Sequence, residues 1–114
     1  MRALVLALGF VLTTLPALAE TIAPADASAH IGQTVTVEGT VSDVYTSRSG
    51  VTFIDIGGRY PNNTFSGVVF SGDAGKFPDV KSLNGKTIDI TGPVRLYRGK
   101  PEIVLNAPEQ IVSK

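Results

Sequence analysis

Arginine and tyrosine side chains gather in three expected turns of this 114-residue chain. Such pairs are chemically useful, because an aromatic ring stacks on other planar groups while a guanidinium binds anionic oxygens. The candidate ligand-contacting residues in or beside these turns are Tyr45, Arg48, Arg59, Tyr60, Asn62, Arg95, Tyr97, Arg98 and Lys100. They form a single site only if the fold brings the three turns together.

The basic residues are unevenly distributed along the chain. Apart from Arg2, the sequence holds nine basic residues, and five of them lie in or beside these turns, including every remaining arginine. Taken singly, each of these residues has a simpler interpretation: an arginine in a turn is solvated, and a tyrosine beside a turn closes the end of the core. The set as a whole favours a shared binding surface, so both interpretations stay open.

Phe53 is a further candidate because of its position on an expected strand. It shares one strand face with Asp55, while Ile54 and Ile56 point to the opposite face. If Asp55 faces outward, Phe53 is a half-exposed ring on which a planar ligand could stack. If Phe53 is part of the core, it has no such role, and the two alternatives are equally supported. For Asp55 the sequence favours a structural role, in which the carboxylate accepts N–H groups from the glycine loop that follows.

The sequence offers little for catalysis. His30 is the only histidine and the chain has no cysteine, which excludes thiol nucleophiles and thiolate zinc sites. The strand carboxylates Asp43, Asp55 and Asp89 lack the close spacing that a nuclease metal site needs. We therefore expect no enzymatic activity, no cofactor and no metal, and keep a metal-dependent nuclease as the least favoured alternative.

The first 19 residues have the pattern of a secretory signal peptide. Arg2 precedes an apolar run, Pro16 follows it, and Ala17-Leu18-Ala19 matches an A-x-A cleavage site. The apolar run from Ala3 to Leu15 is shorter than the ~20 residues that a membrane span requires. We therefore expect residues 1–19 to be removed and residues 20–114 to form one periplasmic or secreted domain, without a membrane span.

Composition limits the kind of partner that this domain can bind. Without Arg2 the chain has nine basic and ten acidic residues, so its formal charge is near −1. A strong, salt-driven nucleic-acid binder needs a surplus of basic residues. The absence of cysteine means that the exported domain must fold without disulfides, on its core alone. We expect a monomer.

Hydrophobic alternation predicts five strands and two short helices. The strands are expected at 33–45, 50–57, 64–71, 85–97 and 101–106, with one helix at Pro24–His30 and another that begins near Pro78. The alternation of the first strand slips after Val41, which indicates a β-bulge, and Gly39 favours a sharp bend there. Pro93 should lie where strand pairing ends.

This order of elements predicts an all-β fold. Three strands, a short helix and two further strands, with a long bent first strand, match the OB-fold, a five-stranded Greek-key barrel. Ligands of this fold usually contact the face of its second and third strands and the loops 1–2 and 4–5. Those are the regions that carry the candidate side chains.

Two blocks of the sequence also resemble a known family. They are Phe53-Ile54-Asp55 with Tyr60-Pro61-Asn62 and Phe65, and the run from Tyr97 to Ile103. Together with the surrounding stretch 31–111, they resemble a bacterial family of short OB-fold, nucleic-acid-binding-like modules. Members of that family are exported as single modules or are attached to nuclease-like domains.

The sequence therefore supports three functional hypotheses. The leading one is an exported OB-fold module that binds single-stranded nucleic acid through stacking and a few anionic contacts. The second is a module that uses the same loops to bind a protein or a glycan of the cell envelope. The least favoured is the metal-dependent nuclease.

Overall fold

The computed structural model describes residues 19–114, and the expected signal peptide lies outside the described residues except for Ala19. Most regular structure in this part of the chain is β. Its strands are β1 Thr21–Ile22, β2 Thr34–Thr46, β3 Thr52–Ile56, β4 Phe65–Val69, β5 Thr87–Tyr97, β6 Lys100–Val104 and β7 Ile111–Ser113. The five strands expected from the sequence correspond to β2, β3, β4, β5 and β6, and the short β1 and β7 are additions.

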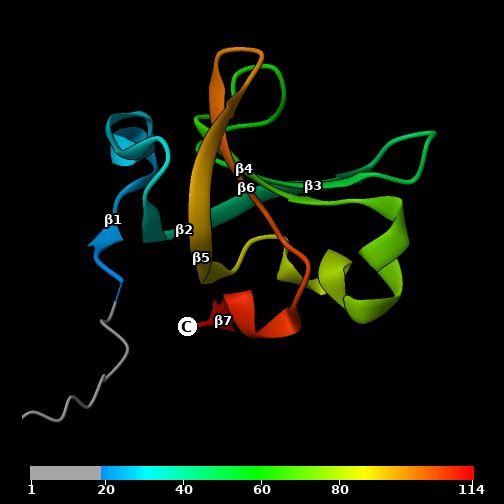
Figure 1. Ribbon diagram of the computed structural model, residues 1–114. Helices are drawn as coiled ribbons and strands as arrows, with labels where there is room; N and C mark the ends of the chain where they lie inside the picture. The colour runs from blue at the N-terminus through cyan, green and yellow to red at the C-terminus, as the bar shows by residue number, and fades with distance from the viewer. Residues whose placement is uncertain (1–18) are drawn as a thin grey trace, which may run out of the picture.

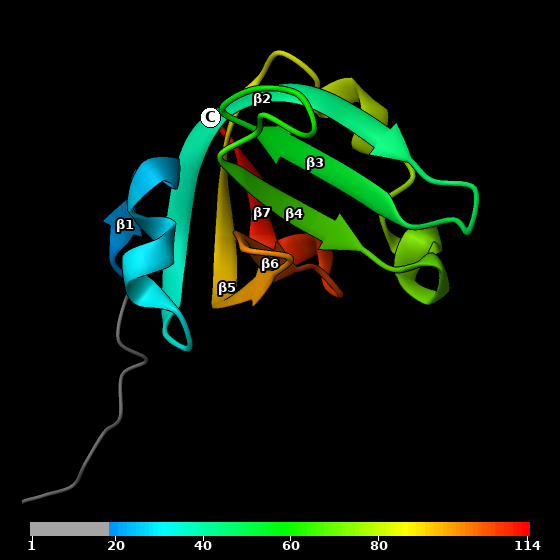
Figure 2. The ribbon, with the colours of Figure 1, turned by 90° about the horizontal axis from the view of Figure 1, so that it is seen from above.

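The strand pairings run in a ring. β2 pairs antiparallel with β3, β3 with β4, and β5 with β6, while β4 and β6 are parallel. The pairing of β5 with β2 then returns to the starting strand. Figure 1 shows β5 beside β6, and Figure 2 shows β2 curving over β3 and β4. The ring encloses the apolar core and turns the outer face of β3 and β4 toward the β5–β6 hairpin.

The bend in β2 allows one strand to serve two partners. Its first half, Thr34–Thr40, pairs with β5, and its second half pairs with β3 after a register shift between Val41 and Asp43. The bulge predicted from the slip in alternation is therefore confirmed. Gly39 lies at the bend, where an added Cβ would come within 2.6 Å of Ile56 Cγ2 and 2.8 Å of Pro24 Cγ. A larger residue there would push β2 away from the core.

The helical segments described between residues 19 and 114 are short 3₁₀ turns. They are η2 Pro24–His30, η3 Ser71–Lys76, η4 Val80–Leu83 and η5 Pro108–Gln110. The helix expected at Pro24–His30 is confirmed in position. The expected helix near Pro78 is instead two 3₁₀ turns that flank this proline, because Gly72, Gly75 and Pro78 all disfavour a continuous α-helix. The segment still closes the core, since Phe77 is buried there.

The core follows the predicted alternation of the long strands. Val35, Val37 and Val41 of β2 are buried, and so are Ile88, Ile90 and Val94 of β5. Leu96 continues the alternation of β5 but is 52% exposed, because the strand extends beyond the core into the hairpin. Pro93 pairs with Thr34 at the last position of the β2–β5 ladder, as expected for a residue without an N–H group. Within residues 19–114, no helix is long and apolar enough to cross a membrane.

Candidate ligand-binding groove

Two adjoining hollows lie on the outer face of β3, β4, β5 and β6. Each has a volume of about 310 Å³, and they share Phe53, Tyr97 and Glu102, so we treat them as one feature, the aromatic groove. The first hollow is lined by Tyr45, Phe53, Asp55, Tyr60, Pro61, Asn63, Ser66, Tyr97, Arg98, Lys100, Pro101 and Glu102. The second is lined by Ser47, Ser49, Val51, Phe53, Val68, Phe70, Arg95, Tyr97 and Glu102.

The fold brings together seven of the ten candidate residues. Six line the first hollow and Arg95 lines the second. The six are Tyr45, Phe53, Tyr60, Tyr97, Arg98 and Lys100. The three expected turns therefore do meet at one feature, because the β2–β3 hairpin, the β3–β4 loop and the β5–β6 hairpin surround the same face. The other three candidates do not line the groove.

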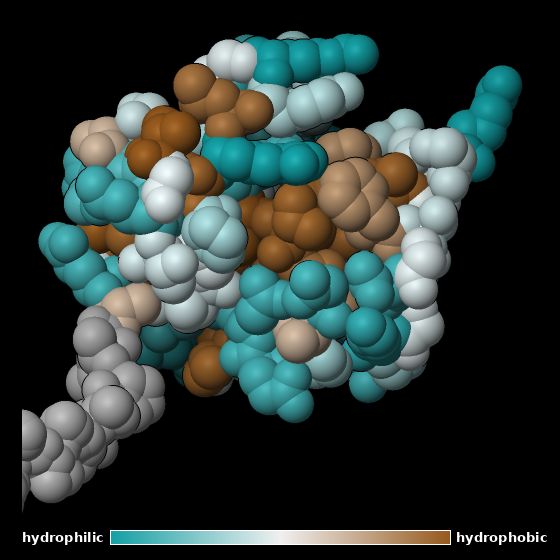
Figure 3. Space-filling view, viewed as in Figure 1, coloured by the Kyte–Doolittle hydropathy of each residue, from teal (hydrophilic) through white to brown (hydrophobic). Residues whose placement is uncertain are grey.

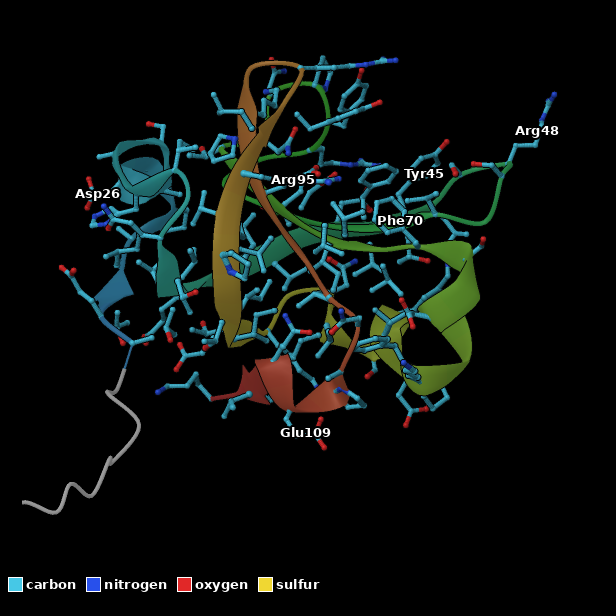
Figure 4. All side chains as sticks on the ribbon, in the orientation of Figure 1. Asp26, Tyr45, Arg48, Phe70, Arg95 and Glu109 are labelled. Carbon is cyan, nitrogen blue, oxygen red and sulfur yellow. The ribbon has the colours of Figure 1, made fainter. Side chains whose placement is uncertain are left out.

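Aromatic rings dominate the groove. The rings of Tyr45 and Phe53 stack with their centroids 6.3 Å apart and their planes at 19°. Tyr60 is 72% exposed and Tyr97 48% exposed, so a large part of each residue is open to solvent. In Figure 3 apolar side chains gather in the hollowed middle of the face where Figure 4 labels Tyr45, Phe70 and Arg95. Phe53 is half-buried on this face, which favours the outward alternative over the core alternative.

Arg95 is held by an acidic partner. Its Nε donates to Glu102 Oε2 at 2.7 Å, and its Nη2 lies 2.7 Å from the same oxygen. The guanidinium also lies over the ring of Phe70, with 5.7 Å from Cζ to the ring centroid. The register of β5 and β6 pairs Arg95 directly with Glu102. Much of the charge of Arg95 is therefore balanced inside the groove.

Lys100 is also engaged within the protein. Its Nζ donates to the backbone carbonyl oxygen of Asn63 at 2.9 Å and to that of Pro61. Both carbonyl groups belong to the β3–β4 loop, so Lys100 connects the β5–β6 hairpin to the segment that carries Tyr60. The side chain acts here as a tether between two walls of the groove.

Among the described residues, the Arg98 side chain has neither an ion pair nor a hydrogen bond, whereas Arg95 pairs with Glu102 and Lys100 donates to loop carbonyl groups. Arg98 occupies the two-residue turn between Tyr97 and Lys100, with φ values of 52° at Arg98 and 81° at Gly99. Positive φ at both central positions is what a two-residue hairpin turn of type I′ requires. The guanidinium lies 5.2 Å from the centroid of the Tyr97 ring, at the rim of the groove.

Arg48, Arg59 and Asn62 lie outside the lining of the groove. Arg48 is at the tip of the β2–β3 hairpin, and its side chain points away from the labelled Tyr45 and Arg95 (Figure 4). Arg59 is near Asp43, with 3.8 Å between Nε and Oδ2, and its side chain is 77% exposed. Asn62 is exposed, and its backbone N–H donates to the carbonyl oxygen of Arg59.

A buried polar network supports the β3–β4 loop from below. Asp55 is 2% exposed and accepts hydrogen bonds from Ser66 Oγ at 2.8 Å and Asn63 Nδ2 at 3.5 Å. Burial raises the pKa of Asp55 above its ordinary value, and nearby Asp43 adds to this shift. Hydrogen bonds from Ser66 and the backbone of Tyr60, together with the charge of Lys100, act on the pKa in the opposite direction. The loop-holding role expected for Asp55 thus uses side-chain donors as well as the backbone of Tyr60.

Two glycines free the backbone of the β3–β4 loop where it leaves β3. Gly57 and Gly58 have φ values of 78° and 120°, a region that residues with a side chain rarely adopt. The peptide bond between Tyr60 and Pro61 is cis. The loop therefore leaves β3 through the glycine pair and returns over the buried Asp55 network.

Several residues that line the groove were not among the candidates. They include Asn63, Ser66, Phe70 and Glu102. Glu102 lies between the apolar residues Pro101 and Ile103 on β6, a pattern that by itself is typical of a solvent-facing position. The antiparallel pairing of Arg95 with Glu102 across the short turn could have indicated the contact, since opposite charges are favoured there. No group of three histidine, cysteine or carboxylate side chains that could hold a metal occurs among residues 19–114.

Comparison with solved structures identifies the fold. The chain is similar to the crystal structure assigned to an aspartyl-tRNA synthetase from Leishmania major Friedlin, with 15% identity and a TM-score of 0.60. That match covers 94% of this chain but 23% of the synthetase chain, so the chain spans about a quarter of it. The OBody AM1L10, solved bound to hen egg-white lysozyme, is 21% identical with a TM-score of 0.62. That match covers 90% of this chain and 98% of the OBody.

Sequence comparisons add no family assignment. No family model and no curated protein matches the chain. The two structural likenesses are both below 25% identity and therefore bear on the fold alone. Together with the ring of strand pairings, they show that this chain has a β-rich, OB-fold-like structure.

Proposed function

We propose that this chain is an exported OB-fold module that binds single-stranded nucleic acid by stacking bases in the aromatic groove. The observation that carries the proposal is the set of five aromatic rings around two adjoining hollows. They are Tyr45, Phe53, Tyr60, Phe70 and Tyr97. Stacking on an aromatic side chain is worth about 1–3 kcal/mol per base and tolerates any sequence.

The position of the groove supports the same function. In the OB-fold, a five-stranded Greek-key barrel, oligonucleotides lie across the second and third strands between the loops 1–2 and 4–5. With β2 counted as the first strand, the groove lies over β3 and β4, between the β2–β3 and β5–β6 hairpins. The synthetase with a similar fold acts on tRNA by its name, which is consistent with a nucleic-acid ligand.

The charges of the groove imply that binding is only weakly electrostatic. Arg95 is paired with Glu102 and Lys100 is engaged with loop carbonyl groups. Arg98 is then the groove cation most available to a phosphate. Each phosphate contact contributes about −0.7 to the slope of log K against log salt for single strands. We therefore expect a slope near −1 or shallower.

The remaining parts of the proposal rest on the sequence. The pattern of residues 1–19 supports export and a periplasmic or secreted location. The blocks that resemble the bacterial OB-fold family support a binding role rather than an enzymatic one. The family assignment itself is part of this proposal.

A titration of fluorescent oligonucleotides with the purified protein tests the function directly. Fluorescence anisotropy should show binding of a single-stranded oligonucleotide at low salt, and weaker binding of the same sequence as a duplex. Repeating the titration at several salt concentrations gives the slope. No binding of single strands at low salt would reject the proposal.

A second candidate is a protein or glycan ligand in the same groove. It is favoured by the buried carboxylates Asp55 and Glu102. Carboxylate groups repel a polyanion, but they can accept hydrogen bonds from sugar hydroxyl groups or peptide N–H groups. The same protein should then fail to bind oligonucleotides and instead bind cell-envelope oligosaccharides in a glycan array, with loss of binding in Tyr60→Ala.

A further inference from the structure

Glu102 occupies the junction of the two hollows, where it lines both of them. Its side chain is 6% exposed, and Arg95 engages one carboxylate oxygen, Oε2. The other oxygen, Oε1, makes no hydrogen bond to any described residue. Two side-chain oxygens in residues 19–114 are both unpartnered and sealed from solvent, Asn63 Oδ1 and Asp89 Oδ1. Glu102 Oε1 is unpartnered but is not one of these two, so it keeps some exposure to solvent. Oε1 is therefore an acceptor that keeps some exposure, on a side chain that lines the groove and is fixed by Arg95.

The polar donors on the groove floor are already used. Ser66 Oγ donates to Asp55, and Asn63 Nδ2 lies between Asp55, Ser66 and the carbonyl oxygen of Phe65. Asn63 Oδ1 remains without a partner among the described residues, beneath the first hollow. Because Asn63 Oδ1 is sealed from solvent, the floor offers a ligand the acceptor Glu102 Oε1 and has few donors left.

We propose that Glu102 makes the aromatic groove selective for bases that carry an exocyclic amino group, with cytosine preferred over thymine. This inference rests on the proposed function, since it assumes that bases enter the groove. The 4-amino group of cytosine is a donor that a carboxylate accepts, whereas thymine has a carbonyl oxygen at that position. Thymine would place this oxygen against Oε1, where two acceptors face each other and neither is satisfied.

The test compares oligonucleotides that differ only in the base. The probes are fluorescent oligo(dC), oligo(dT) and an oligomer of 2-pyrimidinone nucleotides, which lacks both the 4-amino group and the 4-carbonyl oxygen. At neutral pH we expect oligo(dC) to bind about tenfold more tightly than oligo(dT), the change that one hydrogen bond to a charged group gives. The 2-pyrimidinone oligomer should lose most of the affinity of oligo(dC).

The protein-side test is Glu102→Gln, which keeps the shape of the side chain and an oxygen for Arg95. Its amide can present either an acceptor or a donor, so the ratio of affinities for oligo(dC) and oligo(dT) should fall toward one. Glu109→Gln, on exposed η5 far from the groove (Figure 4), should leave the ratio unchanged. Circular dichroism and a thermal melt establish whether both variants are folded. If Glu102→Gln does not fold, the comparison of the three probes with the unaltered protein still tests the selectivity.

The outcomes separate this inference from the proposed function. Equal affinity of the unaltered protein for oligo(dC) and oligo(dT), or an unchanged ratio in a folded Glu102→Gln variant, overturns the selectivity but leaves nucleic-acid binding intact. Absence of binding to all three probes rejects the proposed function, and the selectivity with it.

Discussion

Arg95 and Glu102 face each other across the β5–β6 hairpin, and Arg95 Nε donates to Glu102 Oε2 at 2.7 Å. Arg95 is about half exposed, while Glu102 is almost completely buried. The arginine therefore balances a carboxylate that would otherwise be costly to bury. A residue expected to bind an anionic ligand has a structural partner instead, and this changes which cations are left for a ligand.

Tyr60 should contribute to binding without contributing much to stability. Its ring is 72% exposed, so its removal takes little apolar area from the core. We expect Tyr60→Ala to weaken single-strand binding by about 1–3 kcal/mol, which is a factor of roughly 5 to 160. Tyr60→Phe retains the ring and should bind within a factor of about three. Anisotropy titrations measure this, and a normal affinity in Tyr60→Ala would contradict the stacking model.

Arg98 should affect affinity, salt dependence and stability at once. Its φ of 52° is unfavourable for arginine but is tolerated by asparagine. Arg98→Asn should therefore raise the free energy of unfolding by up to about 1 kcal/mol. It should also weaken binding and move the salt slope toward zero by about 0.7. Urea melts and titrations at several salt concentrations measure the two effects.

The control for Arg98 is Arg48→Asn, which removes the same charge at the tip of the β2–β3 hairpin, outside the groove. It should change neither affinity nor slope at moderate salt. An equal loss in both variants would show that overall charge, and not the groove, determines binding.

Lys100 should act by positioning the β3–β4 loop. Lys100→Met removes the hydrogen bonds to the carbonyl groups of Pro61 and Asn63 but keeps much of the aliphatic stem. We expect a loss of stability of about 1 kcal/mol and weaker binding, because the loop that carries Tyr60 is no longer tied to the hairpin. The salt slope should stay unchanged, in contrast with Arg98→Asn. A slope that moves toward zero by about 0.7 in Lys100→Met would instead identify Lys100 as a direct phosphate contact.

A matched control for Lys100 is Lys81→Met on η4, which is exposed and lines neither hollow. Hydrogen exchange gives an independent readout. Amides of the β3–β4 loop should exchange faster in Lys100→Met, and remain as in the unaltered protein in Lys81→Met.

Asp55 should make stability depend on pH in a defined direction. Burial raises its pKa in the folded state above the ordinary value of 3.8, so the folded protein retains a proton that the unfolded chain has released. The contribution of Asp55 to stability is therefore largest below pH 3.8 and is lost as the pH rises through the raised pKa.

Comparison with Asp55→Asn isolates this contribution, since the other carboxyl groups are common to both proteins. The difference in free energy of unfolding, unaltered protein minus variant, should decrease as the pH rises from below 3.8 through the raised pKa. Urea melts at successive pH values measure it. A difference that increases with pH would mean that hydrogen bonds to the carboxylate outweigh its burial.

The N-terminus offers a test of export. Expression in a bacterium with an intact secretion pathway should yield periplasmic protein whose mass corresponds to a chain that starts at Glu20. Ala19→Tyr should block cleavage, because the peptidase requires a small residue before the cut. A periplasmic protein that still begins at Met1, or a protein confined to the cytoplasm, would contradict the signal-peptide prediction.

Much of the fold follows from local patterns. Alternation locates the long strands because successive side chains point to opposite faces, and Val35, Val37, Ile88 and Ile90 are buried as expected. The slip after Val41 locates the bulge for the same reason. The segment around Pro78 was less predictable, because its glycines and proline permit several short helical turns and local propensity does not choose between them.

The sequence by itself determined which side chains lie in the three turns and which strand face carries Phe53 and Asp55. Only the tertiary structure decided which cations remain for a ligand. Lys100 reaches Asn63 across 37 positions of the chain, and Arg95 meets Glu102 through the register of two strands. These contacts depend on distances and angles between elements, which residue types and spacing along the chain do not encode. The groove is therefore aromatic with an acidic floor, where the sequence suggested an aromatic and basic surface.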